Sequence, residues 1–194
     1  MHVTLAVEGR TDEAVARRLI REAKLDVGNV YGLRGKPGLD AKLGGYNQAA
    51  RHSPWLVLRD LNSDADCAPR LRARLLPDPA PKMRLHIVVR AVEAWLIADA
   101  VSLAEFLSVS SARIPARPEE LENPKATMVQ IARHSRRGAV RDAILPRQDG
   151  SAPVGPGYVA TLTEFAIRRW RPGAAAHQSE SLARLRKHLR ALQR

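Results

Sequence analysis

Residues 55–60, WLVLRD, decide the fold, because this stretch is the clearest β-strand in the chain. Four apolar residues in a row before the charged pair Arg59 and Asp60 are typical of a strand in a sheet that is covered on both faces. The loop that follows, LNSDAD at residues 61–66, adds two more carboxylates to that of Asp60. Carboxylates this close repel one another unless a cation, a helix start or open water relieves them.

Apolar runs on both sides of this strand predict three more strands. They lie at residues 2–7 (HVTLAV), 26–33 (DVGNVYGL) and 85–89 (LHIVV). Helices are predicted at residues 11–24, with Thr11 as the N-cap, and at 40–51, 68–76 and 91–99. Residues 32–38, GLRGKPG, are expected to form a glycine-rich loop that lacks the P-loop pattern. The alternation predicts an α/β fold with a mostly parallel sheet flanked by helices.

The second half of the chain has no clear strand. Helices are predicted at residues 124–134 and 158–170, and again at the C-terminus. The last one carries an apolar stripe of Leu182, Leu185, Leu189 and Leu192 with Arg and Lys around it. We expect this stripe to pack on the body of the protein rather than on a membrane. The chain is therefore predicted to have an α/β core at residues 1–108 and a helical extension at 109–194 packed on that core.

The composition favours a polyanion as partner. The 194 residues include 32 Lys and Arg against 20 Asp and Glu, a net charge of +12, which suits nucleic acid better than an anionic membrane. The alternative is an arginine-rich surface without a specific partner. Cys67 is the single cysteine, which excludes an internal disulfide and fits a reducing compartment. Charges interrupt the longest apolar stretch, residues 85–107, so we expect a soluble cytoplasmic protein without a membrane partner.

Acidic residues follow three of the predicted strands. Glu8 ends the first strand, Asp60 ends the third, and Glu93 lies just past the fourth. Because the carboxyl ends of parallel strands meet at one edge of a sheet, we expect the three side chains to share one cavity. A calcium loop does not explain the stretch after Asp60, since Ala65 stands where that loop needs Gly. Asp66 is expected to cap the next helix, whereas Asp60 suits a magnesium site.

Several segments in this order resemble the motifs of Toprim-fold domains. They are residues 7–19 (VEGRTDEAVARRL), 58–66 (LRDLNSDAD), 89–99 (VRAVEAWLIAD) and 123–126 (NPKA). The resemblance covers roughly residues 1–130. It is to bacterial Toprim-like proteins related to the nuclease part of OLD-family (overcoming lysogenization defect) endonucleases.

This resemblance implies a DNA nuclease of genome (phage) defence that depends on Mg²⁺ or Mn²⁺. Its catalytic residues would be Glu8, Asp60, Glu93 and Lys125. Its metal ligands would be Glu8, Asp60, Asn62 and Asp64. Asn62 departs from the family pattern, because it stands where the second Asp of a D-x-D pair belongs, and Asp64 is the expected substitute.

The resemblance also bears on partners. Since the chain has no P-loop, it implies a separately encoded ATPase, and a homo-oligomer is compatible with it. Basic side chains near the predicted site are expected to contact the nucleic acid, with ordinary solvated charges as the alternative: Arg10, Arg34, Lys36 and Arg59. Two other functions stay open. One is a catalytically weakened binding or regulatory subunit of an ATPase complex, and the other is a small-molecule phosphohydrolase.

Overall fold

One parallel sheet organises the first half of the chain. The computed structural model describes residues 1–148, 150 and 152–192. The strands are β1 (His2–Val7), β2 (Asp26–Gly32), β3 (Trp55–Asp60) and β4 (Met83–Val88), and their order in the sheet is β2-β1-β3-β4. All neighbours pair in parallel, so their carboxyl ends share one edge. The predicted α/β class with a parallel sheet is confirmed.

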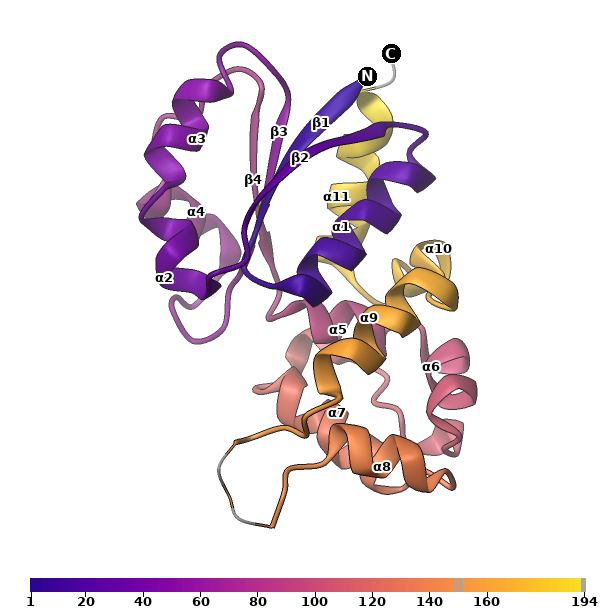
Figure 1. Cartoon of the computed structure of the whole chain (residues 1–194). Coiled ribbons are helices and arrows are strands. Elements are labelled where there is room, and N and C mark those ends of the chain that lie inside the picture. The colour runs from indigo at the N-terminus through magenta and orange to yellow at the C-terminus, as the bar shows by residue number, and fades with distance from the viewer. Residues whose placement is uncertain (149, 151, 193–194) are drawn as a thin grey trace.

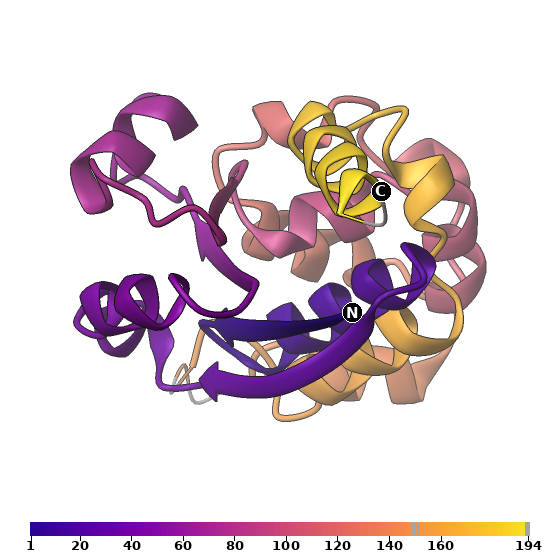
Figure 2. The same ribbon diagram turned by 90° about the horizontal axis from the view of Figure 1, so that it is seen from above.

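Helices cover both faces of this sheet (Figures 1 and 2). The short helices α2 (Gly35–Asp40), α3 (Leu43–Ala49) and α4 (Ala68–Leu75) lie on one face, and α1 (Arg10–Glu22) and α11 (Glu180–Ala191) lie on the other. Successive side chains of β3 point to opposite faces of the sheet and so contribute to both hydrophobic layers. Leu56 and Leu58 join the core under α1, whereas Val57 joins the core under α2 to α4.

The remaining helices form a second group beyond the carboxyl edge of the sheet (Figure 1). They are α5 (Val92–Ile97), α6 (Ala100–Leu107), α7 (Pro124–Arg133), α8 (Gly138–Ile144), α9 (Tyr158–Arg168) and α10 (Pro172–Ala175), with single 3-10 turns at Ser111–Arg113 and Pro118–Glu120. Within the part of the chain that the structure describes, no helix is long and apolar enough to cross a membrane.

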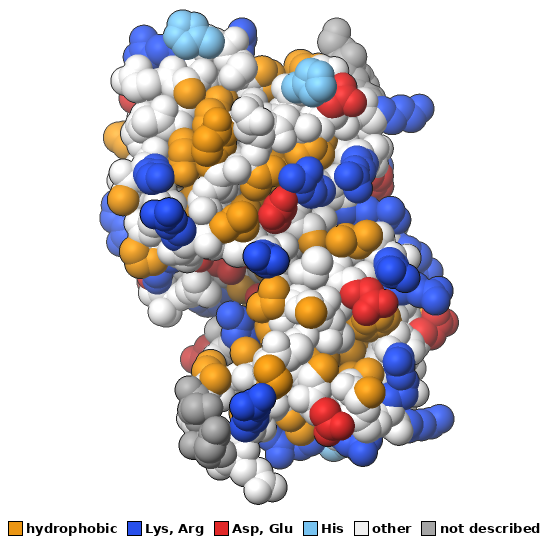
Figure 3. Space-filling view, in the orientation of Figure 1, with side chains coloured by type: hydrophobic (Ala, Val, Ile, Leu, Met, Phe, Trp, Pro, Cys, Tyr) orange, Lys and Arg blue, Asp and Glu red, His pale blue; other side chains and the backbone are white. Residues whose placement is uncertain are grey.

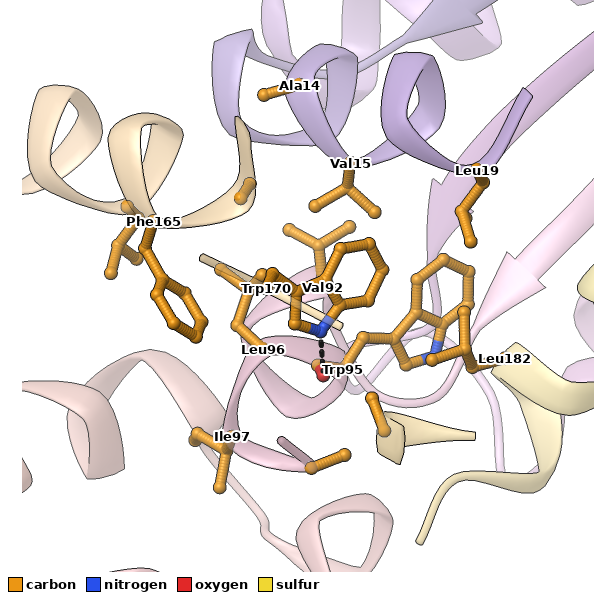
Figure 4. Close-up of a cluster of buried hydrophobic side chains, with 14 of the residues drawn as sticks. Ala14, Val15, Leu19, Val92, Trp95, Leu96, Ile97, Phe165, Trp170 and Leu182 are labelled. Carbon is orange, nitrogen blue, oxygen red and sulfur yellow. Dashed lines mark hydrogen bonds between the residues drawn. The ribbon is translucent and has the colours of Figure 1, made fainter. Parts of the chain in front are cut away.

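The two halves share one hydrophobic core (Figure 4). Trp95 on α5 and Trp170 after α9 are both fully buried, and the indole Nε1 of Trp170 donates to the Trp95 carbonyl oxygen at 3.0 Å. The indole Nε1 of Trp95 donates in turn to the Ser181 hydroxyl on α11 at 2.8 Å. Apolar packing therefore crosses residue 108, where the sequence suggested a boundary.

The C-terminal helix packs on the body of the protein, as its stripe predicted. Leu182, Leu185 and Leu189 of α11 are buried in the shared core, and Leu192 packs partly against it. On the basic side of the helix, the guanidinium of Arg186 pairs with Glu22 on α1 at 2.5 Å. The leucine stripe is therefore largely covered by the chain itself, and Leu192 remains partly exposed.

Two predictions about helix starts were wrong. The first helix is capped at Gly9, and Thr11 is buried inside its first turn, because β1 leads into the helix after only two residues. The helix after β3 is capped at Cys67 without a side-chain hydrogen bond. Asp66 pairs instead with Arg70 one turn later, at 2.8 Å.

The glycine-rich segment after β2 is also more regular than predicted. Residues 35–40 form α2, and the helix predicted at 40–51 is the shorter α3. Gly32 has a φ of +94°, and a Cβ there would lie 2.1 Å from the carbonyl oxygen of Val7. Only glycine fits this close approach, and it turns the chain so that the amide of Gly35 reaches the carbonyl oxygen of Glu8 at 3.0 Å.

Candidate functional site

Four carboxylates gather at the carboxyl edge of the sheet. Glu8 follows β1, Asp12 lies in the first turn of α1, Asp60 ends β3, and Glu93 lies in the first turn of α5. The amide of Asp60 donates to Glu8 Oε1 at 2.9 Å, and the charges of Asp12, Glu8 and Glu93 all act on the Asp60 carboxyl. The structure thus places the three acids named from the sequence together, with Asp12 as a fourth.

Burial makes this cluster unfavourable for negative charge. Burial, followed by the charges of Glu93 and Glu8, raises the pKa of Asp12 from 3.8 to about 7. Burial, with Asp12 as the strongest charge, raises the pKa of Asp60 well above its usual range. Burial also raises the pKa of Glu8, against the opposing hydrogen bond from the Asp60 amide. The acids therefore need protons or a cation to lie this close together.

Two of the carboxylate oxygens are buried without a hydrogen-bond partner among the described residues. They are Oδ1 of Asp12 and Oδ1 of Asp60. A buried polar atom without a partner costs free energy, and such atoms are uncommon in folded proteins. These orphaned oxygens indicate that the site accepts a further group, either a proton or a positively charged ligand.

Glu93 is held by side chains from the helical half. The hydroxyl of Tyr158, the first residue of α9, donates to Glu93 Oε1 at 3.0 Å. Burial, together with the charge of Glu93, raises the pKa of Tyr158, so its hydroxyl stays protonated and remains a donor. Lys125 Nζ lies 4.0 Å from the same Glu93 oxygen and 6.0 Å from the centre of the Tyr158 ring. Lys125 therefore lies beside Glu93 and Tyr158.

Arg59 occupies a different position from that expected of a nucleic-acid contact. Its side chain is only 3 % exposed, and its Nε lies 3.0 Å from Asp40 Oδ1 and 3.6 Å from Glu8 Oε1. Its Nη2 also lies 2.6 Å from Asp64 Oδ2. Because three carboxylates surround this guanidinium, it fixes the end of β3, and few of its N–H donors remain for a phosphate.

Asp64, the expected substitute ligand, is engaged by cations of the protein. Lys36 Nζ lies 2.9 Å from Asp64 Oδ1, and Arg59 holds the other oxygen. The hydrogen bond from Lys36 is the largest cause that lowers the pKa of Asp64, whereas the pKa of Asp60 is raised. Asp64 therefore belongs to an ion-pair network around Arg59, and its charge is already balanced there.

Asn62 has a backbone reason for its place. Its φ is +47°, in the left-handed region where Asn is favoured over most other residues. Its amide donates to the carbonyl oxygen of Arg90 at 2.9 Å, and Nη1 of Arg90 donates back to the Asn62 carbonyl oxygen at 2.8 Å. The amide side chain that departs from the family pattern thus stands at a turn that suits asparagine.

The other basic residues named from the sequence lie beside this edge. Arg10 begins α1 two residues after Glu8, and Arg34 caps α2 just before the Gly35 amide that bonds to Glu8. Both are exposed, whereas Lys36 is paired with Asp64. Arg10 and Arg34 are thus free to meet a ligand in solvent.

The sequence analysis missed Asp12 and Tyr158. Asp12 follows Glu8 by four residues, at a helix start that lies on the carboxyl edge of the sheet. This four-residue spacing could have identified Asp12 as a site residue. The sequence contains no such signal for Tyr158, because its contact with Glu93 joins residues 65 positions apart.

The four carboxylates are not arranged around a common point as the ligands of a metal ion are. Within the described residues, no group of three or more His, Cys, Asp and Glu side chains is arranged to hold a metal ion. Comparisons of the chain with models of protein families, with curated proteins and with solved structures found no match. The chemistry of the site therefore has to be argued from its own residues.

Proposed function

We propose that the chain is a nuclease that cleaves nucleic-acid phosphodiester bonds, with DNA as the expected substrate and Mg²⁺ or Mn²⁺ as cofactor. The observation that carries the proposal is the pair of orphaned carboxylate oxygens, on Asp12 and Asp60, within a cluster of four acids. Hard divalent cations take oxygen ligands, and their charge removes the repulsion that otherwise raises the pKa values of these groups.

The donor set fits such a cation. Glu8, Asp12 and Asp60 would hold it, since these three carboxylates have raised pKa values and two of them carry an unsatisfied oxygen. This set differs from the one named from the sequence, because Asp12 takes the place of Asn62 and Asp64. When bound, the ion supplies Lewis acidity and a water molecule of lowered pKa.

The other residues position the reacting groups. The Asp60 amide and Arg59 fix Glu8, and the Tyr158 hydroxyl fixes Glu93. Lys125 is more than half exposed, so its ammonium group can reach a phosphate oxygen while it remains near Glu93. Arg10 and Arg34 flank the edge and would hold the phosphate backbone without reading its sequence.

The biological setting rests on the resemblance to Toprim domains. It supports a role in genome defence, in the cytoplasm, beside a separately encoded ATPase. The net charge of +12 supports a polyanionic substrate. Figure 3 shows Lys and Arg side chains on both the sheet half and the helical half of one face. This spread suits a long polymer better than a small phosphorylated molecule.

A second function is favoured by one observation. Because no three acidic side chains within the described residues stand ready to hold a metal ion, the chain suits a regulatory or binding subunit whose metal site is weakened. In that case it would bind nucleic acid without cleaving it.

Cleavage of supercoiled plasmid in Mg²⁺ or Mn²⁺ separates the two functions. Asp60→Asn and Glu8→Gln should each lower the cleavage rate at least about a hundredfold, because each removes a charged ligand of the ion. Asp66→Asn is the matched control, since Asp66 is on the same loop but is exposed and pairs only with Arg70. It should leave the rate unchanged.

Calorimetry of Mg²⁺ binding on the same variants completes the test. The nuclease proposal requires that the wild-type chain bind the ion and that Asp60→Asn weaken binding. A wild-type chain that binds DNA but neither binds the ion nor cleaves would leave the regulatory function in its place.

A further inference from the structure

A cavity of about 240 Å³ lies beside β4, at the open edge of the sheet. Helix α4 borders it with Arg72, and α11 borders it with Ser181 and Arg184. The strand contributes Arg84 and His86, which are two residues apart and so point to the same face of the sheet. Among the described residues that line this cavity there is no Asp or Glu.

Arg84 is an unusual arginine in this molecule. Its Nε is buried and has no hydrogen-bond partner, and neither Arg84 nor Arg72 forms an ion pair within the described residues. Other partly buried or buried arginines have an acceptor: Arg59 pairs with Asp40, Arg186 pairs with Glu22, and Arg90 donates to the carbonyl oxygen of Asn62. A buried guanidinium N–H without an acceptor is costly, and an anion would relieve it.

His86 reports the positive charge around the cavity. Its side chain is 7 % exposed and lines the cavity. Burial, with the positive charge of Arg84 next, lowers the pKa of His86 to about 3, so its ring is neutral. The unsatisfied N–H donor that the strand presents to this cavity is therefore that of Arg84.

We propose that this cavity binds a phosphate group through the guanidinium groups of Arg72 and Arg84, with Arg184 at the rim. Guanidinium N–H groups form a planar fork that matches phosphate oxygens, and bonds between opposite charges are the strong ones. Arg184 already pairs with Glu180, so it contributes less than the other two.

The size of the cavity limits what carries the phosphate. Pockets for drug-sized ligands measure roughly 300–1,000 Å³, so this one suits a phosphate with a small organic part. The phosphate belongs either to a nucleic-acid backbone or to a small phosphorylated molecule. The inference does not depend on the carboxylate cluster or on the proposed nuclease.

Titration of inorganic phosphate into the whole chain at low ionic strength, followed by calorimetry, tests the site. The wild-type chain should bind phosphate saturably. Arg72→Ala and Arg84→Gln should each weaken the affinity about tenfold, because each removes a charge-assisted hydrogen bond. Arg72 is exposed on α4, so its replacement leaves the fold intact even if Arg84→Gln does not.

Arg70→Ala is the matched control, because Arg70 has the same charge on the same helix but is paired with Asp66 outside the cavity. It should leave the phosphate affinity unchanged. The proposal is overturned if wild-type chain shows no saturable phosphate binding, or if Arg70→Ala weakens binding as much as Arg72→Ala does.

A second arm identifies the source of the phosphate. The same variants are titrated with a short single-stranded oligonucleotide and with glycerol phosphate. Loss of oligonucleotide affinity in Arg72→Ala, but not in Arg70→Ala, assigns the cavity to a nucleic-acid backbone. Loss confined to glycerol phosphate assigns it to a small phosphorylated molecule.

Discussion

At the scale of single residues, Asp12 and Asp60 combine burial with three acidic neighbours. Each carboxyl has an oxygen without a partner, and each has a raised pKa because water has been removed from around it. Glu8 differs, since it accepts a hydrogen bond from the Asp60 amide and lies near Arg59. The protein therefore stabilises one acid of the cluster with its own groups and leaves two acids to be stabilised by something else.

This contrast predicts that Asp12 contributes more to the stability of the metal-free protein at pH 5 than at pH 8. The folded pKa of Asp12 is about 7, whereas an unfolded Asp titrates near 3.9. Between these values the folded chain holds a proton that the unfolded chain has lost. The contribution of Asp12 to the free energy of unfolding therefore falls as the pH rises, by roughly 2–4 kcal/mol. His86, whose pKa is lowered to about 3, acts in the opposite direction below about pH 6.5, so the effect of Asp12 is read from its variant.

Urea unfolding in a chelator at the two pH values measures the effect. Asp12→Asn should raise the stability at pH 8 relative to that at pH 5, whereas Asp66→Asn should not, because Asp66 is exposed. An Asp12→Asn protein with the same pH dependence as the wild-type chain would contradict the account of the cluster.

At the scale of elements, the sequence predicted the sheet well and the site in part. The four strands are runs of apolar residues, and such runs carry their own signal of burial on both faces. The predicted start of α1 was wrong because the path of the chain from Glu8 to Asp12 along the sheet edge depends on the whole fold. Tyr158 was missed for the same reason, since three helices, α6 to α8, lie between it and Glu93 along the chain.

The loop before α9 therefore deserves a direct test. The amide of Gly155 donates to the carbonyl oxygen of Ile144 at 2.8 Å, which fixes the loop on α8 three residues before Tyr158. A Cβ at Gly155 would lie 2.4 Å from the carbonyl oxygen of Ala143, so backbone must move to accept it. Gly155→Ala should cost roughly 1–3 kcal/mol of stability and lower the cleavage rate by displacing Tyr158 from Glu93.

Gly44→Ala is the matched control for this change. Gly44 is in α3, and no atom lies within 4 Å of a Cβ built there. Its replacement should stabilise the protein by about 0.5–1 kcal/mol, because Ala favours a helix, and leave the cleavage rate unchanged. Thermal unfolding and plasmid cleavage are measured on both variants. A Gly155→Ala protein as stable as Gly44→Ala would show that the loop does not hold α9.

At the scale of the whole molecule, the sheet half and the helical half together build the site. Glu8, Asp12 and Asp60 come from the sheet half, whereas Lys125 and Tyr158 come from the helices beyond it. The shared core of Trp95 and Trp170 keeps the two halves in register. The sequence suggested an α/β core with an appended helical extension. The spacing of apolar residues predicts which face of each helix is buried, but it does not tell how much apolar surface joins the core to the extension.

The charge of the whole molecule leads to the last prediction, which concerns salt. If nucleic acid binds across the carboxyl edge of the sheet, about three cations are available there, because Lys36 is paired with Asp64: Arg10, Arg34 and Lys125. Releasing the counterions of about three phosphates lowers the affinity roughly fortyfold between 50 and 200 mM salt, with little dependence on sequence. Arg34→Ala should reduce the slope of log affinity against log salt by about one. Arg51→Ala should leave the slope unchanged, because Arg51 precedes β3 at the opposite edge of the sheet and has the same charge. Fluorescence anisotropy with two unrelated duplexes measures the slopes, and equal slopes for the two variants would place the nucleic acid away from the carboxylate cluster.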